Sequence, residues 1–190
     1  MSLKNPPDRW GPVSQLLHWS IALLVIAMAA LGLWMTDLPN TPRKIEVYAL
    51  HKSIGITLFA LVLVRIAWRW YAGAPAPLPG QPRWQMRAAS VTHAALYALL
   101  LAMPLTGWLL NAWGGYPLQW FGLLNLPRVL ARNPELQERA AALHEAGFWL
   151  LLVLVLVHVG AALHHHLFRN DATLSRMLPP RRTTHEGDRP

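Results

Sequence analysis

The sequence predicts an all-α integral membrane protein, a bundle of four transmembrane helices with both termini in the cytoplasm. Composition is the first indication: 54% of the 190 residues are hydrophobic and 14% are charged, whereas charged residues make up about a quarter of ordinary soluble domains. Four apolar segments are each long enough to cross a hydrocarbon core of about 30 Å. The third indication is that Lys and Arg are concentrated in alternate connecting segments.

The four spans are expected at residues 14–36, 47–70, 88–113 and 140–168. The first is too long for the core of a signal peptide and lacks a cleavage pattern, so we expect it to be retained. The second is the weakest, because cations near both ends leave a clean apolar run only over residues 53–64. Pro104 is expected to kink the third span. The spans form one domain over residues 1–190, which ends in a polar tail, residues 171–190.

The basic residues predict the orientation. They are enriched before the first span, between the second and third spans, and in the tail, whereas the other two loops mix basic with acidic residues. Cytoplasmic loops carry the excess of Lys and Arg, so both termini are expected on that side. The net charge of +8 is then a topology signal and does not indicate nucleic acid. The outer face stays mildly basic, which would attract an anionic substrate.

The chain contains no cysteine. This absence excludes disulfides, iron–sulfur clusters, thiolate-ligated haem and the C-x-x-C-H covalent haem attachment. A redox centre in this protein must therefore be held by histidine or methionine.

Two histidines in the last span, His144 and His158, are fourteen residues apart. Four helical turns put both on nearly one face, about 21 Å apart along the axis. One helix thus offers a ligand near each side of the membrane. By depth, His51 is expected beside His144 in an outer layer. Either His18 or His93 is expected beside His158 in an inner layer, and depth does not choose between them.

Two facing imidazoles without further ligands suit the axial positions of a haem. A closed zinc site would require four ligands, although copper or zinc stays an alternative. A single histidine within a span often only bonds to another helix. Because these four histidines form two pairs at matching depths, a merely interhelical hydrogen-bonding role for all four is not expected.

Three further residues are candidate cofactor contacts. Arg65 lies fourteen residues beyond His51, so we expect it to face the interior and to neutralise a haem propionate or bind a quinone carbonyl. Its alternative role is a snorkelling anchor. Gly55, one turn beyond His51, and Gly147, near His144, would let a flat macrocycle lie against each helix, the alternative being close helix packing. No catalytic acid, base or nucleophile is expected.

The remaining histidines lie at the inner end of the last span and beyond. His164, His165 and His166 close that span, and we expect them at the membrane interface as proton or quinone-headgroup contacts. His185 falls in the polar tail and is not expected to take part.

Several motifs resemble the prokaryotic cytochrome b561 family. They are Leu17-His18-Trp19, Leu50-His51-Lys52-Ser53-Ile54-Gly55, Val64-Arg65, His144-Glu145 with His158 fourteen residues later, and the stretch from His164 to Pro179. The resemblance covers nearly the whole chain. It implies a bacterial inner-membrane protein with two non-covalently bound b-type haems, the inner held by His18 and His158 and the outer by His51 and His144.

The same resemblance implies an oxidoreductase. It suggests that superoxide is oxidised to dioxygen at the periplasmic side and that electrons pass to a quinone, ubiquinone or menaquinone, leaving His93 as a candidate near the quinone. The alternative is a cytochrome b anchor subunit that links a partner dehydrogenase or hydrogenase to the quinone pool. A non-redox membrane protein that binds free metal or haem is the third class.

Overall fold

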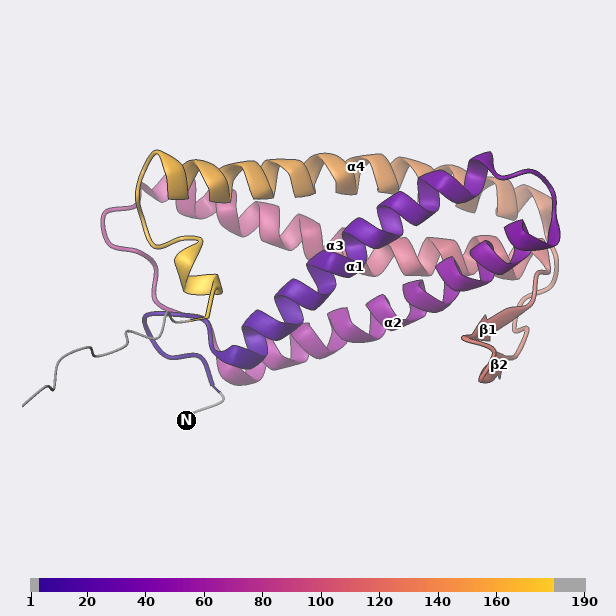
Figure 1. Ribbon diagram of the computed structural model, residues 1–190, viewed down its shortest axis with the longest axis horizontal. Coiled ribbons are helices and arrows are strands. Elements are labelled where there is room, and N and C mark those ends of the chain that lie inside the picture. The colour runs from indigo at the N-terminus through magenta and orange to yellow at the C-terminus, as the bar shows by residue number, and fades with distance from the viewer. Residues whose placement is uncertain (1–3, 180–190) are drawn as a thin grey trace, which may run out of the picture.

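Four long helices make up most of the protein, whose computed structural model describes residues 4–179. They are α1 (Pro12–Asp37), α2 (Pro42–Ala72), α3 (Arg83–Gly114) and α4 (Pro134–Leu167). All four are long and apolar enough to cross a membrane. They run lengthwise in one elongated bundle, with α1 crossing it diagonally (Figure 1). The predicted all-α four-helix membrane bundle is confirmed.

The helices extend beyond the predicted spans at most of their ends. Three of them begin at a proline, Pro12, Pro42 and Pro134, where the fixed φ angle and the missing N–H suit a first helical turn. Polar residues that the apolar pattern assigned to loops therefore form helical turns outside the hydrophobic region. The fourth predicted span ended one residue late, since Phe168 is the C-cap. Helix α3 continues through Pro104.

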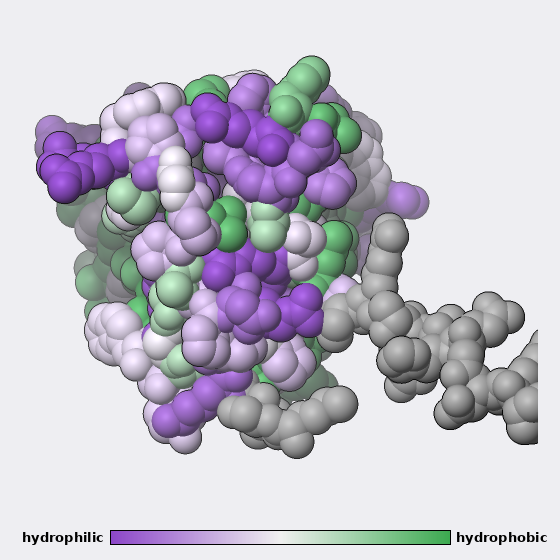
Figure 2. All heavy atoms as spheres, turned by 90° about the vertical axis from the view of Figure 1, so that its left-hand side faces the viewer, coloured by the Kyte–Doolittle hydropathy of each residue, from purple (hydrophilic) through white to green (hydrophobic). Residues whose placement is uncertain are grey.

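Both ends of the described chain lie at one end of the bundle, which we call the terminal end. A short 3-10 helix, η1 (Ser175–Met177), is bonded there to the start of α1. The Trp10 N–H donates to the Arg176 carbonyl at 3.2 Å, and the Trp19 indole N–H donates to the Met177 carbonyl at 2.9 Å. Figure 2 looks onto this end and shows hydrophilic residues across most of it. Its polarity suits a surface outside the hydrocarbon core. The part of the predicted tail beyond residue 179, with His185, lies outside the described residues.

The Arg176 guanidinium joins three segments at the terminal end. It donates to the backbone carbonyls of Asp8, Pro7 and Ala76. These carbonyls belong to the N-terminal segment and to the α2–α3 connection. One side chain from beyond α4 thereby satisfies backbone groups that precede α1 and follow α2.

The opposite end of the bundle, the hairpin end, carries a small antiparallel hairpin. Strand β1 (Leu118–Trp120) pairs with β2 (Leu124–Leu126), with Leu118 opposite Leu126. The turn has positive φ angles at Phe121 and Gly122, and the Leu123 N–H donates to the Trp120 carbonyl. This is the geometry of a type I′ turn. The hairpin is not predicted from the sequence, because Phe-Gly lacks the Asn or Asp that usually marks such a turn.

The helices pack as a chain of neighbours. Close backbone packing joins α1 to α2, α2 to α3, and α3 to α4, whereas α4 has at most marginal backbone contact with α1 and α2. Few apolar side chains are buried among the described residues, and Ile21, Leu58 and Val62 form the cluster in which they pack together. Many apolar side chains on the outer faces are exposed, as expected for surfaces that meet lipid.

We predict that Val62→Ala lowers the free energy of unfolding in mixed micelles by about 1 kcal/mol, since it opens a cavity in the core. The Val62 side chain is 0% exposed. The matched control is Val64→Ala on the same helix, at a side chain that is 54% exposed and has little packing to lose. Denaturant titrations of both variants test this, and equal effects would contradict the assigned core.

Candidate functional site

Two pairs of imidazoles connect α4 with the helices opposite it. Toward the terminal end, the rings of His18 on α1 and His158 on α4 are centred 6.2 Å apart. Toward the hairpin end, the rings of His51 on α2 and His144 on α4 are centred 6.4 Å apart. All four side chains are half-buried. The structure thus brings together both pairs expected from the sequence.

The spacing of each pair suits a metal held between two rings. An imidazole nitrogen bonds a first-row metal at about 2.0–2.1 Å, and with about 1.1 Å from nitrogen to ring centre the two centres would lie about 6.3 Å apart. Both measured separations are close to this value. Along residues 4–179 no hydrogen bond joins the two rings of either pair. The buried Nδ1 of His51 has no hydrogen-bond partner there.

The donor set distinguishes haem from a bare ion. Within the described residues, no group of three or more His, Cys, Asp or Glu side chains is placed to hold a metal. A closed zinc site needs such a group, whereas the axial positions of a haem need only two imidazoles. The pairs also lie where α4 has little backbone contact with α1 and α2. The residues present therefore fit haem.

A third imidazole, that of His93 on α3, also approaches His158. Their rings are centred 5.4 Å apart, so both residues that the depth argument left open lie near His158. The His18 ring keeps the separation seen in the other pair, whereas the His93 ring is closer and its side chain is exposed. Geometry thus favours His18 as the partner of His158.

Thr106 on α3 orients His144, a role that the sequence analysis missed. The Thr106 hydroxyl donates to the Met103 carbonyl at 3.0 Å, and its oxygen lies 3.0 Å from His144 Nδ1. The single hydroxyl hydrogen is used at Met103, so Thr106 accepts from the N–H at Nδ1. This tautomer leaves the Nε2 lone pair of His144 free for a metal. Hydropathy and spacing carry no signal for such a partner.

Two glycines that the sequence analysis did not single out make room for the hairpin-end imidazoles. A Cβ on Gly107 would lie 3.1 Å from His144 Cε1, and one on Gly32 would lie 3.5 Å from His51 Cε1. The first distance is tighter than ordinary contact. Gly107 is therefore needed for the close approach of the His144 ring to α3.

The two glycines that were singled out meet methionines. A Cβ on Gly55 would lie 3.7 Å from Met28 Cε, and one on Gly147 would lie 2.8 Å from Met103 Sδ. Both positions thus accept a side chain from a neighbouring helix. These contacts match the close-packing alternative for both glycines.

Arg65 lies toward the terminal end, with its guanidinium inside the bundle. Its Nε donates to the Tyr97 hydroxyl at 3.0 Å and its Nη1 to the Ser14 carbonyl at 3.3 Å. It lies near enough to His18 and His158 to interact with both electrostatically. Arg69 instead lies over the Trp10 ring, 5.3 Å from its centre.

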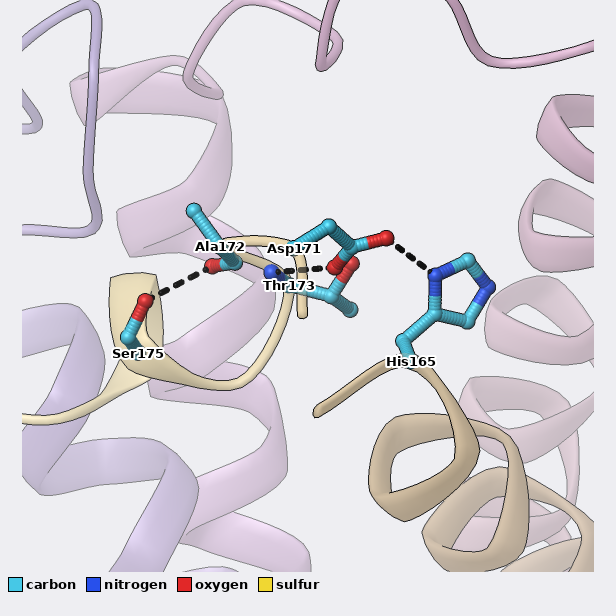
Figure 3. Close-up of polar contacts among 5 residues, drawn as sticks. All are labelled: His165, Asp171, Ala172, Thr173 and Ser175. Atoms are coloured by element: carbon cyan, nitrogen blue, oxygen red, sulfur yellow. Dashed lines mark hydrogen bonds and ion pairs between the residues drawn. The ribbon is translucent and has the colours of Figure 1, made fainter. Parts of the chain in front are cut away.

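Of the histidine triplet at the end of α4, His165 has an acidic partner. Its Nδ1 lies 2.5 Å from Asp171 Oδ2, and Asp171 Oδ1 accepts from the Thr173 N–H (Figure 3). Burial raises the pKa of Asp171, but the hydrogen bonds from His165 and Thr173 outweigh it and lower the pKa to about 2. Asp171 is thus a carboxylate at neutral pH and accepts the hydrogen bond at His165 Nδ1.

The hairpin is held against α2 by the residues that directly follow His51. Lys52 donates to the Pro117 carbonyl at 2.8 Å. Ser53 donates to the Gln119 carbonyl and accepts from the Phe121 N–H, while Thr57 accepts from the Trp120 indole. A polar stripe on one helix face thereby fixes the hairpin close to the His51 and His144 pair.

Comparison with known proteins agrees with this geometry. Residues 9–180 match the family described as prokaryotic cytochrome b561. The chain is 39% identical to cytochrome b561 homolog 2 of Escherichia coli K12 over 94% of this chain and 95% of that protein. It is 33% identical to cytochrome b561 homolog 1 of the same organism, over 92% and 99%. It is 29% identical to the protein named probable superoxide oxidase CybB of Yersinia pestis, over 87% and 93%.

The match to the family and the identity to two of its members both extend over most of the chain. Four helices able to span a membrane and imidazoles in facing pairs are what a membrane cytochrome requires. The chain belongs to the prokaryotic cytochrome b561 family, and is a multi-pass protein of the bacterial inner membrane that binds b-type haem and transfers electrons.

Proposed function

We propose that the chain is a superoxide:quinone oxidoreductase with two b-type haems, one at each imidazole pair. Two superoxide anions, one quinone and two protons would yield two dioxygen molecules and one quinol, which balances atoms and electrons. The observation that carries the proposal is that two imidazole pairs lie along one bundle with similar distances between ring centres, 6.2 and 6.4 Å. The name of the Yersinia pestis relative supports superoxide as the donor.

In this proposal His51 and His144 hold the outer haem, and His18 and His158 the inner one. The haems, when bound, supply the one-electron transfer chemistry. The chain contributes position and electrostatics: Thr106 sets the tautomer of His144, and the hairpin is bonded to α2 at Lys52, Ser53 and Thr57. Gly55 stays in the proposed outer site as a small residue one turn beyond His51, with Met28 packed against it.

We place the hairpin end in the periplasm and the terminal end in the cytoplasm. The basis is the excess of Lys and Arg in the segments at the terminal end, which follows the positive-inside rule. Superoxide then arrives at the hairpin end and the quinone, ubiquinone or menaquinone, is reduced near the terminal end. This direction carries the electrons inward.

Two groups near the terminal end suit the quinone reaction. Arg65 has guanidinium N–H groups beyond the two bonded to Tyr97 and Ser14, and these can neutralise a haem propionate or donate to a quinone carbonyl. His165, with the Asp171 carboxylate beside it, can hold one of the protons that quinol formation consumes. His93 lies near the same layer and is the third candidate.

We expect the isolated chain in lipid nanodiscs to reduce a soluble ubiquinone analogue when superoxide is supplied. Quinol formation followed optically, with superoxide dismutase added as the control, measures this reaction. Addition of the dismutase should abolish it. No quinol from the isolated chain, together with a dehydrogenase or hydrogenase that co-purifies with it, would support the anchor-subunit function instead.

The ligand assignment predicts that His144→Ala removes one haem per chain and leaves the other, because each pair belongs to a different centre. His93→Ala is the matched control and should retain both haems, although its ring is near His158. A pyridine haemochrome assay with protein quantification gives the haem count. Loss of a haem in His93→Ala would contradict the assignment of His18.

The role of Thr106 predicts that Thr106→Val weakens haem retention at the outer site about tenfold, since partners of metal-bound histidines contribute 10- to 100-fold in affinity. Thr106→Ser keeps the hydroxyl and should behave like the wild type. Haem loss to an excess of a haem-scavenging protein measures the difference. Equal rates for the Val and Ser variants would show that the hydroxyl does not act on His144.

A further inference from the structure

Lys52 at the hairpin end is a half-buried cation without an acidic partner. Its Nζ donates to Asn111 Oδ1 at 3.1 Å and to the Pro117 carbonyl at 2.8 Å. Both acceptors are neutral, and no ion pair found within residues 4–179 involves Lys52. An ammonium group has three N–H donors, so one remains. A partly desolvated charge without a counterion is costly, and a bound anion would offset that cost.

A recess of about 240 Å³ lies beside Lys52 between α3 and the hairpin. Asn111 and Pro117, the two acceptors of the Lys52 ammonium, both line it. Arg128 lines it as well and donates to the Gly115 carbonyl at 2.8 Å, again a neutral acceptor. None of the lining residues is acidic. The recess therefore has one cation in its wall, Arg128, and a second, Lys52, which is not a lining residue but is bonded to two residues that are.

The size of the recess suits a small hydrated anion. A water molecule occupies about 30 Å³ of liquid volume, so the recess has room for a diatomic or triatomic anion with several waters. Its polar wall includes Asn111, which is 4% exposed and donates to the Tyr116 carbonyl at 3.1 Å. The buried amide and the hairpin hold part of the wall in place, and Arg128 adds an exposed cation at its edge.

We propose that Lys52, Arg128 and the recess that they flank form a binding site for a small inorganic monoanion at the hairpin end. Lys52 directly follows His51 in α2, so an anion bound here interacts electrostatically with the outer centre. That the natural anion is superoxide rests on the proposed function. The site itself rests only on the geometry of these residues.

Lys44 provides a matched control variant. It also lies at the hairpin end and donates from Nζ to two backbone carbonyls, those of Thr36 and Leu38. The recess is lined by residues of α3 and of the segment that follows it, and Lys44 bonds to none of them. Lys44→Gln removes the same charge from the same end of the molecule and leaves the proposed site intact.

The test uses the haem-loaded full chain in nanodiscs and thiocyanate as an inert probe, at constant ionic strength with a bulky reference anion. The midpoint potentials of both haems are measured by spectroelectrochemical titration as thiocyanate rises. We expect a saturable fall in the outer potential alone, in the wild type and in Lys44→Gln, and no thiocyanate dependence in Lys52→Gln. An unchanged wild type, or an equal shift in Lys52→Gln, overturns the site.

A second measurement separates the site from the proposed function. The rate constant for haem reduction by superoxide should fall about tenfold in Lys52→Gln and become less sensitive to ionic strength. A thiocyanate site in a chain that superoxide does not reduce would support the anion site and contradict the proposed function. If Lys52→Gln fails to retain both haems, Arg128→Gln replaces it. Half-saturation by thiocyanate should then need a several-fold higher concentration, and an unchanged half-saturation overturns the site.

Discussion

The arrangement depends on how α4 faces α1 and α2 through imidazoles instead of through close backbone packing. Helices α1, α2, α3 and α4 pack in sequence as neighbours, but α4 has at most marginal backbone contact with α1 or α2. The rings of His18 and His158, and of His51 and His144, lie across that seam. The seam is where a membrane protein can hold a flat cofactor while each helix satisfies its own backbone hydrogen bonds.

Both ends of the bundle are closed by segments that bond across it. At the terminal end, the Arg176 guanidinium joins the N-terminal segment to the α2–α3 connection. At the hairpin end, Lys52 and Ser53 hold the hairpin to α2 by donating to backbone carbonyls. These bonds use charged and hydroxyl groups at the edges of the membrane, where their burial costs less than in its core. The polar bonds that close the bundle thus lie at its two ends.

Much of the fold was predictable from the sequence, because the length and hydropathy of a segment are enough to identify a membrane span. The proximity of His51 to His144 was also predictable, because each lies near the outer start of its span, and the fourteen residues from His144 to His158 place the second layer four helical turns away. Depth alone does not show whether His18 or His93 is the partner of His158, because both rings lie near the His158 ring. The hydrogen bond from His144 to Thr106 and the hairpin were not predictable, since each depends on side chains that only tertiary packing brings together.

Each of the two imidazole pairs is proposed to hold one haem. The most direct measurement is the number of haems per chain combined with low-temperature electron paramagnetic resonance of the oxidised protein. We expect two haems per chain, both low-spin, as six-coordinate iron between two imidazoles would be. A single haem per chain, or a high-spin signal from a haem with one protein ligand, would contradict it.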